Sequence, residues 1–124
     1  MAFLPYSIDD GRVSANEYIP AGAITPAVGM ALVVEGGAAA IAAGEDKPQY
    51  ICVTKNEGEE IAAIRVQDDM IFETTAAAAF TSVKVGDKVN ITADGLEVNA
   101  TTGGAAEVVA IEGTEIGAKI RVRF

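Results

Sequence analysis

Carboxylates are the side chains of this sequence with the clearest chemical potential, because they occur in close groups. Convergent carboxylates can act as a general acid and base, or bind calcium. None of the groups follows the spacing of an EF-hand loop, and adjacent residues on a strand point to opposite faces. Each group stands beside turn-forming residues, so we interpret these as hydrated turn acids rather than as a site. The groups are Asp9-Asp10, Glu45-Asp46, Glu57 with Glu59-Glu60, and Asp68-Asp69.

The other reactive residue types lack the partners that catalysis requires. Histidine is absent and Cys52 is the single cysteine of the 124 residues. These counts exclude Ser-His-Asp and Cys-His catalysis, histidine-ligated metals, zinc–thiolate sites and an internal disulfide. Cys52 has no basic neighbour in sequence, so we interpret it as a small buried hydrophobe. No glycine-rich stretch has the spacing of a phosphate-binding loop. We therefore expect a protein that is not an enzyme and uses no cofactor or metal.

The charge balance argues against polyanionic partners. The chain has 9 Lys and Arg against 18 Asp and Glu, which gives a net charge of −9. Nucleic acids and anionic membrane surfaces both attract Lys and Arg, so we expect neither as a partner. The longest nearly apolar stretch, residues 21–34, contains Pro26 and is shorter than a membrane span. The first ten residues lack the basic region of a secretory signal, so we expect synthesis inside a cell.

The first 27 residues differ in composition from the rest. Pro5, Pro20 and Pro26 prevent a continuous helix or central strand there. Several large apolar side chains in this segment are costly to leave in water. We expect residues 1–27 to form an extended arm that contacts another molecule; the alternative is that the segment packs along its own domain. The residues expected to carry the contacts are Phe3, Leu4, Tyr6, Ile8, Tyr18 and Ile19.

Residues 28–124 have the pattern of a single β-rich domain. Short runs rich in Val and Ile are separated by Gly, Asp, Asn and Glu. Asp94-Gly95 predicts a type I′ hairpin turn, and Ala76 to Ala79 predict at most one short helix. We expect a mainly β fold, a small β-barrel or β-sandwich of short antiparallel strands. The expected strands lie within Met30–Val34, Tyr50–Thr54, Ile61–Val66, Lys88–Thr92, Glu107–Ile111 and Ile116–Phe124.

A weak internal repeat suggests two similar β units. Val28-Gly29 recurs 57 residues later as Val85-Gly86, each followed by an apolar run and a glycine-containing turn. Ile64-Arg65-Val66 recurs after 56 residues as Ile120-Arg121-Val122. Two units of this size would close on each other into a barrel or sandwich. The alternative is that Val-Gly pairs and glycine-rich turns recur in unrelated β proteins.

Nearly the whole chain resembles a family of small proteins encoded in the structural modules of tailed bacteriophages, beside the major capsid protein. These are head decoration, or capsid cement, proteins. Their motifs are structural rather than catalytic, and none in this sequence marks a capsid contact. The segments that carry the resemblance are Tyr18–Ala21, Ile24–Pro26, Val28–Leu32, Lys47–Ile51, Ile64–Val66, Ile71–Thr74, Val85–Val89, Asp94–Leu96 and Ile120–Phe124.

The resemblance implies a virion structural protein that binds the outer surface of the capsid, as a trimer, and stabilises the head. Its partners would be the major capsid protein and further copies of itself, and its location the capsid exterior after assembly in the host cytoplasm. The composition agrees, because such a protein needs no active site and gains from multivalent contact. The alternatives are a tail, neck or head-completion subunit of the virion, and a non-viral protein- or carbohydrate-binding β module.

Overall fold

The chain forms two antiparallel β-sheets that share a core. The structure, a computed structural model, describes residues 2–8, 16–53, 60–68 and 70–124, without the side chains of residues 5–8 and 16. The six-stranded sheet has the order β1 (Leu4–Ile8), β7 (Met70–Thr75), β11 (Lys119–Arg123), β10 (Ala106–Ile111), β8 (Lys88–Ile91), β9 (Val98–Thr102). The five-stranded sheet has the order β2 (Asn16–Pro20), β6 (Glu60–Arg65), β5 (Tyr50–Cys52), β3 (Ala31–Glu35), β4 (Ala38–Ile41).

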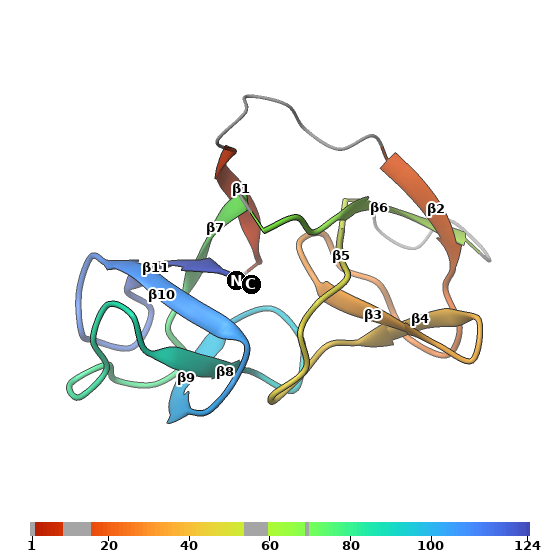
Figure 1. Cartoon of the computed structure of the whole chain (residues 1–124). Helices are drawn as coiled ribbons and strands as arrows, with labels where there is room; N and C mark the ends of the chain where they lie inside the picture. The colour runs from red at the N-terminus through yellow and green to blue at the C-terminus, as the bar shows by residue number, and fades with distance from the viewer. Residues whose placement is uncertain (1, 9–15, 54–59, 69) are drawn as a thin grey trace.

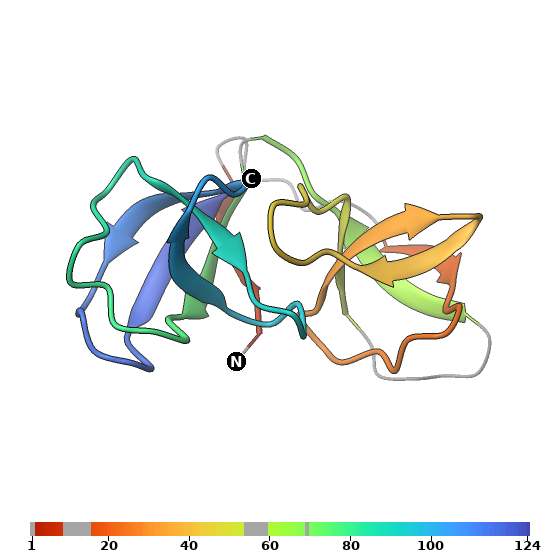
Figure 2. The same ribbon diagram turned by 90° about the horizontal axis from the view of Figure 1, so that it is seen from below.

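Neither sheet closes into a barrel, so of the two expected architectures the chain has the open, two-sheet one. The sheets lie side by side, the five-stranded one containing β3 and β4 and the six-stranded one containing β10 and β11 (Figures 1 and 2). In the five-stranded sheet the outer strands β2 and β4 approach each other without pairing, because the sheet is strongly curled. The prediction of a mainly β fold is confirmed.

The strand orders show that the fold is built twice. The five-stranded sheet runs β2-β6-β5-β3-β4, and the six-stranded sheet contains β7-β11-β10-β8-β9. The second order is the first with every strand number raised by five. The chain therefore consists of a first unit, β2 to β6, and a second unit, β7 to β11, and β1 is an additional strand on the second. The internal repeat seen in the sequence corresponds to this duplication.

The backbone at the entrance to β3 and β8 shows how closely the two units agree. Gly29 donates its N–H to the carbonyl of Cys52 at 2.7 Å, and Gly86 donates to the carbonyl of Val108 at 2.8 Å. The two glycines have φ values of 82° and 97°, in the left-handed region that favours glycine. Each Val-Gly pair thus turns the chain into the second strand of a unit (β3 or β8) while bonding to that unit's fourth strand (β5 or β10).

A shared hydrophobic core joins the units. The larger core cluster combines Phe72 and Ile120 of the six-stranded sheet with Ile51 and Ile64 of the five-stranded sheet. A second cluster lies within the curl of the five-stranded sheet and includes Ile61 of the same strand as Ile64. Because alternate residues of β6 face different clusters, this sheet is buried on both faces. Neither unit encloses its own apolar surface alone.

Two local expectations differ from the structure. No helix occurs among the described residues, and Ala77 instead donates its N–H to the carbonyl of Val98 at 2.8 Å. Four alanines are too short a run to offset helix nucleation, so pairing with β9 determines the conformation. The turn at Gly95 exists, with φ of 73°, but Asp94 does not have positive φ, so the turn is not of type I′. The carboxylate of Asp94 accepts a bond from the Leu96 N–H at 3.1 Å instead.

Candidate interaction surfaces

The N-terminal segment supplies an outer strand to each sheet. β1 pairs antiparallel with β7, with Leu4 opposite Glu73, and β2 pairs with β6, with Tyr18 opposite Ala62. The structure therefore has the arrangement in which this segment packs along its own domain. The surface that β1 and β2 offer to a partner is presented by strands already paired within the fold.

The six residues expected to carry contacts are divided between core and surface. Phe3 is completely buried, and Ile19 is 8% exposed, each within one of the two core clusters. The side chains of these two are enclosed by the chain itself, so they present no surface in this arrangement. Leu4 and Tyr18 are 49% and 67% exposed and remain available. Tyr6 and Ile8 belong to β1, but their side chains lie outside the described residues.

Phe3 links the two units at their junction. Its ring meets the ring of Phe124 edge-on with centroids 5.4 Å apart, and Phe124 in turn lies 5.7 Å from Phe72. The Phe3 N–H donates to the carbonyl of Gly29, in the first unit, at 2.9 Å. A Cβ on Gly29 would lie 2.1 Å from the Cβ of Ala2, so only glycine permits this approach.

A charged cluster fixes β2, the strand that carries Tyr18. Arg65 donates from Nε and Nη2 to the two carboxylate oxygens of Glu17, each at 3.0 Å, and lies 4.9 Å above the Tyr50 ring. The hydrogen bond from Arg65 lowers the pKa of Glu17, and burial raises the pKa of the Tyr50 hydroxyl. Because the acid and the phenol are already bonded, this cluster has the chemistry of a structural clamp.

The second unit has the corresponding pair, which sequence reasoning missed. Arg121 donates to Glu73 at 3.2 Å between β11 and β7, as Arg65 does to Glu17 between β6 and β2. Both pairs span 48 residues of sequence. The signal was available in the repeated Ile-Arg-Val triplets, because a duplicated arginine predicts a duplicated partner.

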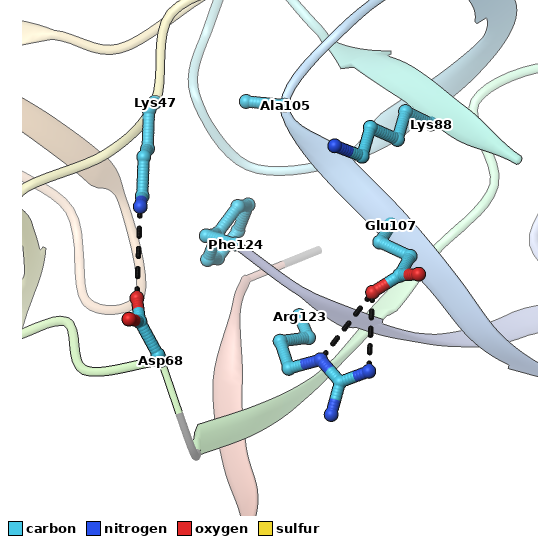
Figure 3. Close-up of a pocket in the computed structure, with 7 residues that line it drawn as sticks. All are labelled: Lys47, Asp68, Lys88, Ala105, Glu107, Arg123 and Phe124. Atoms are coloured by element: carbon cyan, nitrogen blue, oxygen red, sulfur yellow. Dashed lines mark hydrogen bonds and ion pairs between the residues drawn. The ribbon is translucent and has the colours of Figure 1, made fainter. Parts of the chain in front are cut away.

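A polar cavity of about 310 Å³ lies at the junction between the units, with Lys47 and Asp68 on one side (Figure 3). Lys47 Nζ lies 3.6 Å from Asp68 Oδ1, and Arg123 donates to Glu107 at 3.1 Å. Both carboxylates therefore face a cation. The remaining lining residues are Lys88, Ala105 and Phe124.

The carboxylates and the cysteine that were first considered for chemistry do not converge on a site within the described residues. Cys52 is buried, as the sequence predicted. Glu45 and Asp46 are exposed, whereas Asp9, Asp10, Glu57, Glu59 and Asp69 lie outside the described residues. Within the described parts of the chain, no group of three or more Cys, Asp or Glu side chains is placed to hold a metal ion.

The exposed apolar side chains are the features that remain for recognition. Besides Leu4 and Tyr18 they include Val28 and Val85, which occupy equivalent positions at the entrances to β3 and β8, and Ile116. Sequence reasoning used the valines as markers of the repeat and missed their exposure. Within the described ranges, no helix is long and apolar enough to cross a membrane. Comparisons of the chain with protein-family models, with curated proteins and with solved structures find no match.

Proposed function

We propose that this chain is a virion structural protein that binds the outer surface of a tailed-phage capsid, as a trimer, and stabilises the head. The proposal rests on the resemblance of the sequence to head decoration proteins. The observation of the structure that supports it best is Tyr18, an aromatic residue that is 67% exposed on an outer strand. Exposed tyrosines of this kind are enriched where proteins meet, because the ring is apolar and the hydroxyl can bond.

The residues on either side of Tyr18 favour binding because they hold its backbone in place before a partner binds. Glu17 is held by Arg65, and Ile19 is buried in the core of the first unit. The side chain between them therefore projects from a backbone that is fixed before any partner arrives. A preorganised contact of this kind loses less conformational entropy on binding than a free arm would.

The direct test is binding to phage heads that lack this protein. Added wild-type chain should bind the heads in many copies and raise the temperature at which they release DNA. Tyr18→Ser should lower the bound copy number, because it removes the aromatic contact while leaving the flanking anchors. Thr101→Ser is the matched control, since Thr101 is also exposed but is a polar residue of β9 in the second unit.

Two results would contradict the proposal. Absence of wild-type binding to such heads would remove the capsid as a partner. A copy number limited to a few per virion would favour the neck or tail alternative. Full binding by Tyr18→Ser would leave the capsid assignment standing and remove Tyr18 as its contact.

A further inference from the structure

β1 is the strand that does not belong to the repeated unit. Both units contain five strands in the same order, and β1 is added to the outer edge of β7 in the second unit. Along the chain, however, β1 directly precedes β2, which is an outer strand of the other sheet (Figure 1). The second unit is thus completed by a segment from the far end of the sequence.

The contacts of β1 are those of a bound extended peptide. Phe3 is its anchor, completely buried against Phe124, and the Phe3 N–H bonds to the carbonyl of Gly29. The pairing with β7 is short and has a register shift between Pro5 and Ser7. One buried aromatic side chain combined with main-chain pairing is the mode by which proteins accept an added strand.

We propose that the edge of β7 and the pocket of Phe3 form a strand-acceptor site that takes β1 from a second copy of this chain. Every copy has the same acceptor and the same strand, so the contacts made within one chain and between two chains are identical. Exchange of an identical element is therefore a low-cost route to association. This inference does not depend on the capsid as a partner.

The concentration of copies determines which arrangement prevails. A strand tethered by a short connection competes at an effective concentration of about 1 mM. The connection between Ile8, at the end of β1, and Asn16, at the start of β2, tethers β1 to the rest of the chain. It joins strands of different sheets. Dilute chains should keep their own strand, whereas chains held together at millimolar density should exchange it. The exchange would link neighbouring copies through the β7 acceptor site, which β1 already occupies in each copy, and would need no additional contact surface.

The test is a disulfide that can form only between chains. Leu4 lies opposite Glu73 in the β1–β7 pairing, at a separation typical of antiparallel neighbours that a disulfide can span. One full-length chain carries Leu4→Cys and another carries Glu73→Cys, both with the buried Cys52 replaced by alanine. The two chains are unfolded, refolded together at about 1 mM, oxidised and analysed by mass spectrometry.

The expected product is a covalent heterodimer of the two variants, at a yield that falls when refolding is carried out at a hundredfold lower concentration. Lys88→Cys in place of Glu73→Cys is the matched control, because Lys88 is exposed but lies on β8, away from β1. A heterodimer yield no greater than that of the Lys88→Cys control overturns the proposal.

Discussion

At Gly29 the fold depends on the absence of a single carbon atom. The Cβ of any other residue at position 29 would collide with Ala2, and that residue would also have to adopt a φ of 82°. Its counterpart Gly86 has a similar φ of 97° but open space around the added atom. The two glycines therefore separate the cost of backbone strain from the cost of displacing the N-terminal segment.

We expect Gly29→Ala to lower the free energy of unfolding by about 2–3 kcal/mol and Gly86→Ala by about 1 kcal/mol. The strain is common to both variants, and the collision with Ala2 occurs in the first alone. Urea unfolding of the two variants and the wild type provides the measurement. Equal losses would mean that the N-terminal segment moves away from Gly29 at no cost.

Glu17 is the residue whose charge should make stability depend on pH. Its pKa is lowered in the folded chain, chiefly by the hydrogen bond from Arg65. A carboxyl group with a lowered folded-state pKa contributes stability above its ordinary pKa, and this contribution is lost as the pH falls through the folded-state value. The contribution is therefore complete at neutral pH and decreases below about pH 4.5, the ordinary value for the group.

We expect Glu17→Gln to reduce stability at neutral pH and to make the loss of stability below pH 4.5 less steep than in the wild type. Glu60→Gln, at an exposed position on the neighbouring strand β6, is the control and should leave the profile unchanged. Unfolding midpoints measured from pH 3 to pH 7 would decide. Parallel profiles for wild type and Glu17→Gln would show that the carboxylate does not couple to folding.

Among the elements, the end of β7 is held to the β8–β9 connection by a buried hydroxyl. Thr74 is almost completely enclosed, and its Oγ1 donates to the carbonyl of Leu96 at 2.8 Å. Thr74→Val keeps the shape but leaves that carbonyl without its donor, so we expect a loss of about 1–2 kcal/mol. Thr101→Val, at an exposed position on β9, should change stability by less than about 0.5 kcal/mol. Thermal unfolding compares them; equal effects would mean that Leu96 finds another donor.

Strands with strong apolar patterns could be predicted from the sequence, and those made of small or polar residues could not. Ala31–Glu35 and Lys119–Arg123 fall on predicted segments because both are rich in large apolar residues, which in Lys119–Arg123 alternate with charged ones. Ala38–Ile41 and Val98–Thr102 were missed, because alanine, asparagine and threonine have little periodic signal and these strands exist through pairing with β3 and β8. The burial of Phe3 could not be predicted from the sequence either, because its ring packs against Phe124, at the opposite end of the sequence.

At the scale of the molecule, the shared core predicts that both units unfold together. Ile64 faces the core common to the two sheets, and Ile61 on the same strand faces the core of the first unit. We expect alanine at either position to cost about 3 kcal/mol and to leave a single transition. Circular dichroism and amide exchange of strands from both units would test this. Separate transitions for the two units, in either variant, would contradict it.

The duplication also affects how many equivalent surfaces an assembly of these chains presents. Val28 and Val85 are exposed at matching positions, so one chain offers the same apolar contact twice. In the proposed trimer, three chains would carry six copies of one module. Such a trimer would have threefold symmetry but would present six similar units, a number that matches neighbours arranged with sixfold symmetry. Sequence differences between the first and second units would then determine which neighbour each unit binds.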